Sequence, residues 1–176
     1  MTRIIAAFDS FKGSLTSREA GEAFRSGFME VHPDAEVVVL SIADGGEGTV
    51  DALVQTLGGE YVHPIVFDPL RRRIEACYGV VDGGYTAVME MSSASGLPLL
   101  AEHERNPLHT TSYGTGEMIA SALERGCRKF LVGIGGSATN DAGVGMLEAL
   151  GFRFYDVDGE PLSGGGEILQ RIARID

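Results

Sequence analysis

The sequence predicts an α/β fold built on a parallel sheet, and two observations lead to that prediction. Continuous apolar runs at residues 4–8 and 37–42 have the length and composition of buried strands. Each run is followed by apolar residues at helical spacing, beginning after Thr16 and again at Val50. A strand–helix–strand–helix order implies parallel strands joined by crossover helices, so we expect a first lobe of this kind.

Local signals define the ends of the two helices. Thr16 and Glu19 have the spacing of a capping box, which favours a helix start at this point. The residue before Pro33 avoids the helical conformation, so the first helix should end there. Gly58 and Gly59 close the second helix, because glycine readily adopts the left-handed conformation of a helix C-terminus.

The pattern changes after Gly59. Short strand-like runs joined by turn signals are typical of an antiparallel meander; the runs cover residues 61–67, 74–81 and 85–91. A helical pattern near residues 116–125 and an apolar run at 129–134 then restore the α/β alternation. We therefore expect two domains, residues 1–60 and residues 61–176, of which the second is a mixed α/β lobe.

Composition excludes several classes of partner. With a net charge of −11, the chain lacks the clustered Lys and Arg that nucleic acids and anionic membranes require. The run at residues 71–73 is the one basic cluster, and we interpret these three arginines as a solvated turn. Two cysteines without a CxxC motif predict a reducing compartment. Because the sequence shows neither a signal peptide nor an apolar run of membrane-spanning length, we expect a soluble cytoplasmic protein.

A glycine-rich segment at residues 133–143 is the most informative feature of the chain. It follows a strand-like run and precedes a helical pattern that starts at Val144. A strand, a glycine-rich turn and a helix N-terminus together predict an anion-binding site. The segment also carries polar groups that can contact a ligand; the candidates are Gly135, Gly136, Ser137, Thr139, Asn140 and Asp141. The alternative is that Asn140 and Asp141 merely cap the next helix.

A second candidate segment follows the first strand directly. In parallel α/β sheets, ligands bind outside the carboxyl ends of the strands, so Asp9, Ser10 and Ser14 come at a favourable place. Lys12 lies between them, and the chain has only one other lysine, Lys129. An ammonium group here can balance the charge of a phosphate. The alternative is an ordinary surface loop.

A third candidate segment follows the second strand. If the two strands are parallel, Asp44 lies on the same edge of the sheet as Asp9. The carboxylates of Asp44 and Glu47 are hard oxygen ligands that suit Mg²⁺, which takes one or two carboxylates plus substrate phosphates. The alternative is a plain loop in which Glu47 complements the dipole of the following helix.

Two weaker candidates remain. The segment 105–117 is rich in hydroxyl groups, which either cap a helix or bind a carboxylate or hydroxyl substrate, with Arg105 as a bidentate partner. Glu90 and the serine-rich residues 92–96 end a strand-like run.

Two nucleotide-binding motifs can be tested directly. A Walker loop is excluded, since neither lysine precedes Ser or Thr. A degenerate dinucleotide fingerprint matches as Gly133-x-Gly135-x-x-Ala138 with Asp156 further on, which leaves a dinucleotide-dependent oxidoreductase open. The match is weak, because the helical period resumes only near Val144.

Read together, these segments resemble the type I glycerate kinase family. The resemblance covers five blocks in the family's order and spacing, namely AFDSFKGSL at 7–15, ADGGEGT at 43–49, EMSSASGL at 90–97, residues 106–117 and residues 133–145. It implies transfer of phosphate from ATP to glycerate, giving 2-phosphoglycerate, with Mg²⁺ as cofactor. It also implies a flavodoxin-like lobe assembled from both ends of the chain, with the second α/β lobe inserted into it.

Family members are about twice this length, so we expect the chain to be an N-terminal portion with an incomplete first lobe. Phe8 stands where a proline is usual, and Ala142 where a glycine is usual. The sequence leaves open whether the portion is active or only binds a small acid, which hydroxyl group is phosphorylated, and whether the protein forms a homo-oligomer.

The resemblance also suggests roles for the candidate residues. Lys12 and the backbone of residues 133–136 would bind phosphate or the substrate carboxylate. Asp44, Glu47 or Asp141 would hold Mg²⁺. One of Asp9, Asp44 and Asp141 would orient the substrate hydroxyl and accept its proton; these carboxylates are not ranked further.

Overall fold

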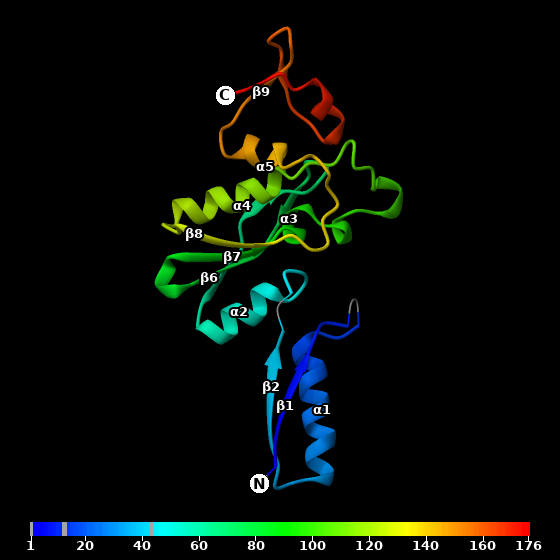
Figure 1. Cartoon of the computed structure of the whole chain (residues 1–176), viewed down its shortest axis with the longest axis vertical. Coiled ribbons are helices and arrows are strands. Elements are labelled where there is room, and N and C mark those ends of the chain that lie inside the picture. The colour runs from blue at the N-terminus through cyan, green and yellow to red at the C-terminus, as the bar shows by residue number, and fades with distance from the viewer. Residues whose placement is uncertain (1, 12–13, 43) are drawn as a thin grey trace.

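The structure is a computed structural model that describes residues 2–11, 14–42 and 44–176. Figure 1 shows two layered parts along the long axis. The N-terminal part contains β1 (Arg3–Phe8), α1 (Ser17–Val31) and β2 (Glu36–Ser41). The larger part contains the remaining strands and helices, and the C-terminus lies at its far end. The expected α/β fold with a parallel lobe and a mixed lobe is confirmed.

The first lobe is a two-stranded parallel sheet covered by one helix. β1 pairs with β2 from Arg3↔Glu36 to Phe8↔Ser41. α1 crosses between them and packs on both strands. The predicted capping box is present: the Thr16 side chain accepts from the Glu19 N–H, while the Glu19 carboxylate accepts from the N–H of Thr16.

α2 (Thr49–Leu57) packs against the second sheet instead of β1 and β2. Its apolar face forms a small core with two strands of that sheet, made of Val50, Val54, Val81 and Val88. Gly58 ends the helix as predicted, in the left-handed conformation at φ 71°, and the Gly59 N–H donates to the Val54 carbonyl. A division by packing therefore falls before α2. The domain boundary at residue 60 stays a prediction.

The second sheet has the strand order β3-β6-β7-β8. Its strands are β3 (Glu60–Val62), β6 (Tyr78–Val81), β7 (Thr86–Glu90) and β8 (Lys129–Gly133). β3, β6 and β7 are antiparallel, as the meander prediction requires, and β8 returns parallel to β7.

Two of the three predicted meander strands are each broken in two, so that part of the prediction is wrong. β4 (Ile65–Phe67) and β5 (Arg73–Glu75) leave the main sheet and form a separate hairpin. The break after β3 coincides with Pro64, which has no N–H to donate to a ladder. The Pro64 carbonyl accepts instead from the Ala76 N–H at 3.0 Å, just where the second run is interrupted.

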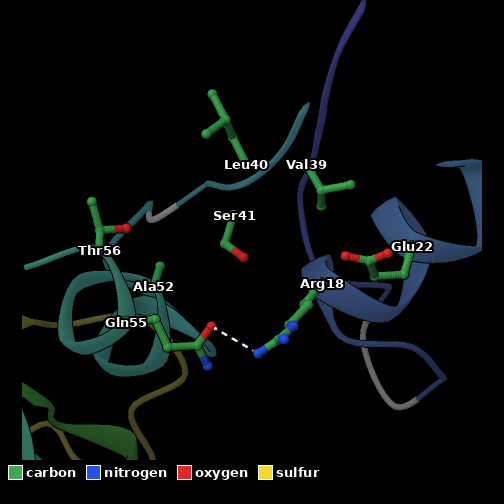
Figure 2. A pocket seen from close by; sticks show the side chains of 8 residues that line it. All are labelled: Arg18, Glu22, Val39, Leu40, Ser41, Ala52, Gln55 and Thr56. Carbon is green, nitrogen blue, oxygen red and sulfur yellow. Dashed lines mark hydrogen bonds between the residues drawn. The ribbon is translucent and has the colours of Figure 1, made fainter. Parts of the chain in front are cut away.

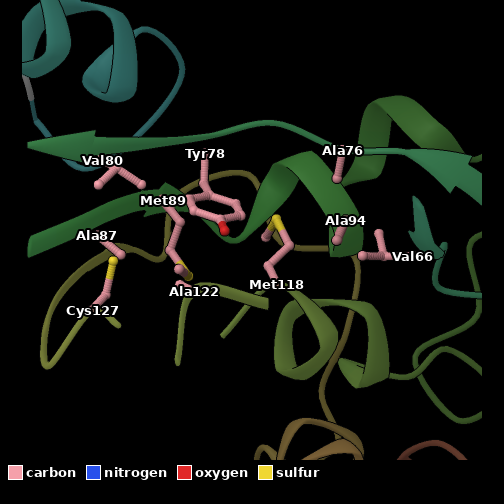
Figure 3. Packing of buried hydrophobic residues seen from close by; sticks show 10 residues of the cluster. All are labelled: Val66, Ala76, Tyr78, Val80, Ala87, Met89, Ala94, Met118, Ala122 and Cys127. Carbon is pink, nitrogen blue, oxygen red and sulfur yellow. The ribbon is translucent and has the colours of Figure 1, made fainter. Parts of the chain in front are cut away.

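The main core lies between the second sheet and α4 (Tyr113–Glu124). Figure 3 shows Tyr78 and Met89 from the sheet facing Met118 and Ala122 from α4. The Tyr78 hydroxyl is paired with the Ser121 hydroxyl at 3.1 Å, so this buried aromatic ring keeps its polar atom satisfied.

The C-terminal segment is packed. α5 (Val144–Ala149), β9 (Phe154–Tyr155), β10 (Pro161–Leu162) and β11 (Arg174–Ile175) surround a small core of Val144, Phe154, Leu162 and Ile168. A Cβ at Gly165 would lie 2.5 Å from the Leu108 carbonyl oxygen. Glycine is required there by a close approach of two backbones.

The three arginines at residues 71–73 are exposed, as expected for a solvated turn, and each also forms ion pairs. Arg71 pairs with Glu148 on α5 at 3.0 Å. Arg72 pairs with Asp68 and with Glu104, and Arg73 pairs with Glu117 on α4. The guanidinium groups therefore tie the β4–β5 hairpin to the elements around it.

None of the helices in the described part of the chain has the length and apolarity needed to cross a membrane.

Candidate functional site

The loops after β1 and β2 leave the same edge of the first sheet, as the sequence predicts. Because Phe8 pairs with Ser41 at the ends of parallel strands, Asp9 and the segment leading to Asp44 start side by side. Asp9 and Asp44 are both exposed, and Asp9 Oδ1 accepts from the Ser10 N–H at 2.7 Å. Lys12 lies outside the described residues.

The acidic loop of residues 44–48 rests directly on the glycine-rich loop of residues 133–136. The Gly135 N–H donates to the Gly45 carbonyl at 3.1 Å. A Cβ at Gly133 would lie 2.4 Å from the Gly45 carbonyl oxygen, and one at Gly135 would lie 2.9 Å from the Gly46 Cα. These glycines are therefore required by the contact between the two loops, in addition to any contact with a ligand.

A third segment, residues 92–97, joins the same place from the end of β7. Two backbone bonds hold it there: the Leu97 N–H donates to the Gly136 carbonyl at 2.9 Å, and the Ala138 N–H donates to the Ser95 carbonyl at 2.8 Å. Beside this bridge, the hydroxyl groups of Ser137 and Thr139 lie 3.1 Å apart and bond to each other. The structure thus brings together three of the segments that the sequence marked separately.

Asp141 differs most from its predicted role. It is 2% exposed, and its carboxylate accepts from the N–H and the hydroxyl of Ser112 at 2.8 and 2.9 Å. It also accepts from the Gly143 and Gly145 N–H groups, both at 3.1 Å. The N–H groups at the start of α5 are therefore occupied by the protein itself. The anion site expected in this segment stays a prediction, and the N–H groups that contact Asp141 are not free to serve it.

The donors to Asp141 are unevenly divided between its two carboxylate oxygens. Asp141 Oδ2 accepts from Ser112 and Gly145, whereas Oδ1 accepts from the Gly143 N–H alone, so a role of Asp141 as base or metal ligand stays a prediction. The contacts with Gly143 and Gly145 match the alternative in which Asp141 caps the following helix.

Asp44 and Glu47 carry the type of oxygen ligand that Mg²⁺ prefers. Both carboxylates are exposed in one short loop, and Asp44 Oδ1 accepts from the Gly46 N–H at 2.8 Å, which fixes the direction of this side chain. Among the described residues no three potential metal ligands converge. Mg²⁺ usually keeps several waters and binds through one or two carboxylates plus substrate phosphates, so two carboxylates are a sufficient protein contribution.

Glu90, a weaker candidate in the sequence, contacts the start of α2. It is half-buried at the end of β7, and its Oε1 accepts from the Val50 N–H at 2.9 Å. Burial raises the pKa of Glu90, while the N–H groups at the start of α2 act in the opposite direction. Glu90 lines a cavity of about 180 Å³ together with Glu47, Asp51 and Cys77. No local pattern reveals this contact, because Glu90 and Val50 are far apart in sequence.

The remaining candidates lie apart from these loops or carry no described contact to them. Arg105 is exposed after the short helix Glu102–Glu104, and Asn140 is exposed with its carbonyl packed near Gly166. Ser14 is exposed in the loop after β1, where its N–H donates to the Phe11 carbonyl.

A larger cavity, of about 490 Å³, lies between α1, β2 and α2. Figure 2 shows Arg18 reaching from α1 to Gln55 on α2, with a hydrogen bond of 3.2 Å. None of the predicted site residues lines this cavity, so we do not assign the candidate site to it.

The dinucleotide fingerprint does not have the required structural context. Gly133 ends β8, but the next helix begins only at Val144. The strand that follows, β9, pairs antiparallel with β10 and β11 in a separate sheet. Asp156 is paired with Arg171 and closes a tight turn. A Rossmann unit needs the glycines to open the helix within a parallel strand–helix–strand unit.

The fold and the converging loops define a two-lobed α/β protein whose polar loops gather where strands end. A family profile described as the glycerate kinase family matches residues 4–176. The chain belongs to the glycerate kinase family.

Curated relatives agree with this assignment. The chain is 49% identical to a glycerate kinase of Haemophilus influenzae, 48% to a glycerate kinase of Bacillus subtilis and 45% to a glycerate 2-kinase of Escherichia coli, each over 99% of this chain. A crystal structure from Salmonella typhimurium LT2, provisionally described as glycerate kinase 2, superposes with a TM-score of 0.85 at 46% identity over 99% of the chain. The chain spans about half the length of these relatives: 46% of each curated protein and 47% of the crystallised one.

Proposed function

We propose that the full-length protein containing this chain is a cytoplasmic glycerate kinase that transfers the γ-phosphate of ATP to glycerate, giving 2-phosphoglycerate, with Mg²⁺. The observation that carries the proposal is the family match over residues 4–176, together with relatives of 45–49% identity that are named glycerate kinase or glycerate 2-kinase. The convergence of residues 44–48, 92–97 and 133–136 supports it, since phosphoryl transfer depends chiefly on positioning and charge neutralisation.

In this proposal, Asp44 and Glu47 hold Mg²⁺ together with the substrate phosphates. The metal neutralises charge on the transferred group. Asp9, exposed at the same sheet edge, orients the substrate hydroxyl and accepts its proton. The place of Lys12 in the proposal depends on the sequence alone, where it follows a strand end as a cation suited to phosphate or carboxylate.

Further groups bind the substrate. The Ser137 and Thr139 hydroxyls and the backbone of Gly136 lie in the glycine-rich loop and offer polar contacts to a phosphate or a small acid. Ser10 and Ser14 offer hydroxyl groups beside Asp9 and Lys12. Arg105 is proposed as a carboxylate partner on the basis of its side-chain chemistry.

The test is a coupled ADP-release assay on the full-length protein with glycerate, ATP and Mg²⁺. We expect turnover that requires all three components and a 2-phosphoglycerate product identified by NMR. The same assay on the present chain alone shows whether this portion catalyses the reaction or only binds the small acid. Absence of turnover by the full-length protein with D- and L-glycerate, at saturating ATP and Mg²⁺, would overturn the proposal.

A further inference from the structure

We propose that Glu90 is a positioning residue that fixes the acidic loop of residues 44–48 against the glycine-rich loop, by serving as the N-terminal cap of α2. The inference deepens the proposed function and rests on it in one respect, namely that this loop binds Mg²⁺. Glu90 touches no proposed substrate group itself; it acts through α2.

The first observation is that α2 lacks a cap of its own. Its N-cap residue is Gly48, at φ 91°, with no side-chain hydrogen bond to the helix. The Glu90 Oε1 atom supplies that bond from another element, 2.9 Å from the Val50 N–H. A carboxylate at a helix N-terminus satisfies an orphan donor and interacts favourably with the helix dipole.

The second observation is that Glu90 stands where three segments meet. It is the last residue of β7 and pairs in register with Gly133, the last residue of β8. The next residue, Met91, donates its N–H to the Gly133 carbonyl at 2.8 Å. Glu90 therefore connects the start of α2 to the strand end that carries the glycine-rich loop.

The third observation is that the acidic loop is built onto α2. The Gly45 N–H donates to the Thr49 hydroxyl at 3.0 Å, and the Thr49 N–H donates to the Gly46 carbonyl at 3.3 Å. Thr49 is the first residue of α2 and is buried. Any displacement of the α2 N-terminus must consequently move the backbone that carries Asp44 and Glu47.

The test compares three variants of the full-length protein. Glu90→Ala removes the cap, and Glu90→Gln keeps an acceptor oxygen of the same reach without the charge. Asp51→Asn is the matched control, because Asp51 is an exposed carboxylate in the same first turn of α2 and has no part in the proposed machinery.

The first readout is amide hydrogen exchange over residues 44–52 without metal or nucleotide. We expect exchange in Glu90→Ala to accelerate there by about tenfold, because one partly buried charge-assisted bond is lost. Glu90→Gln should lie close to wild type, and Asp51→Asn should match it. This measurement does not depend on catalysis, so it remains informative if the proposed function fails.

The second readout is the Mg²⁺ concentration that gives half-maximal kinase activity. We expect it to rise by about tenfold in Glu90→Ala, the scale on which slightly misplaced binding groups act. Glu90→Gln should restore most of the loss. If the Glu90 cap only stabilised the fold, its loss would lower the fraction of active protein and leave the half-saturating Mg²⁺ concentration unchanged.

The inference is overturned if folded Glu90→Ala keeps wild-type exchange over residues 44–52, or if its half-saturating Mg²⁺ equals that of Asp51→Asn. If Glu90→Ala does not fold, Glu90→Asp takes its place, since it withdraws the carboxylate by one methylene while retaining the charge. If the wild-type protein is inactive with glycerate but the variants differ in exchange as expected, the kinase proposal is refuted and the role of Glu90 as the cap of α2 stands.

Discussion

Ala142 adopts a left-handed backbone conformation, at φ 51°, between Asp141 and the N-cap glycine of α5. The left-handed region is unfavourable for L-residues because Cβ crowds the carbonyl oxygen, and glycine avoids this strain. We predict that Ala142→Gly raises the free energy of unfolding by about 1 kcal/mol, less the entropy that glycine adds to the unfolded chain. Urea unfolding of the two proteins measures it.

Ala101 provides the control for this prediction. It is exposed and has φ −62°, so glycine relieves no strain there and only adds freedom to the unfolded chain. Ala101→Gly should therefore lower the free energy of unfolding, by about 0.5 kcal/mol. Equal shifts in both variants would show that the φ of Ala142 does not determine its effect.

Cys77 should react slowly with alkylating reagents. Burial, followed by the nearby charges of Asp51, Glu90 and Glu75, raises the pKa of its thiol. The thiolate is the reactive form, so a raised pKa moves the rise in alkylation rate to higher pH. We predict slower labelling by iodoacetamide than for free cysteine at pH 8, with the gap narrowing at higher pH.

Mass spectrometry locates the label, and Cys127 does not compete because it is fully buried. The same chain unfolded in urea provides the reference, since its cysteines have ordinary pKa values. Native labelling of Cys77 as fast as in urea would contradict the prediction.

At the scale of elements, Asp141 joins the start of α5 to the segment before α4. Its bonds with Ser112, Gly143 and Gly145 connect positions about thirty residues apart, as the fold brings them together. We predict that Asp141→Ala lowers the free energy of unfolding by about 3 kcal/mol, because several buried donors lose a charged acceptor at once. Chemical denaturation of the chain measures it.

A stability loss would confirm the structural role of Asp141. Ser112→Ala removes one of the same hydrogen bonds and should lower stability by a smaller amount. A folded Asp141→Asn full-length variant with wild-type stability and no activity would instead return Asp141 to the catalytic group.

Elements with local signals were predictable, and elements that depend on distant partners were not. The capping box at Thr16 and Glu19 and the glycine end of α2 follow from neighbouring residues, and both are present. The sequence indicated α2 as a helix, but not that its valines would pack on β6 and β7. Helical periodicity shows which face of a helix is apolar, not which sheet will cover that face.

At the scale of the whole molecule, one face of the first sheet is open. Ile5 is 64% exposed and Leu40 48%, whereas the opposite face is covered by α1. Because the chain spans about half the length of its relatives, we expect the rest of the full-length protein to cover this face. Large exposed apolar patches are uncommon on complete soluble proteins.

This expectation predicts that substitutions on the open face affect the stability of the present chain and of the full-length protein differently. Ile5→Thr and Leu40→Thr should each change the unfolding free energy of the present chain by less than about 0.5 kcal/mol. In the full-length protein each should lower it by about 2 kcal/mol, the value for a buried large aliphatic side chain. Parallel denaturation series measure both; equal effects in the two forms would show that the face stays open.

The sequence by itself determined the α/β class, the order of the main elements, the family resemblance and the segments that carry polar groups. Each of these depends on periodicity, on capping and turn residues, or on short motifs, which are properties of neighbouring residues. Tertiary structure alone decided that Asp141 is bonded to Ser112, that Glu90 caps α2, and that Gly133 and Gly135 serve a contact between loops. Those roles depend on hydrogen bonds and close approaches between residues far apart in the chain, and local sequence does not encode such distances.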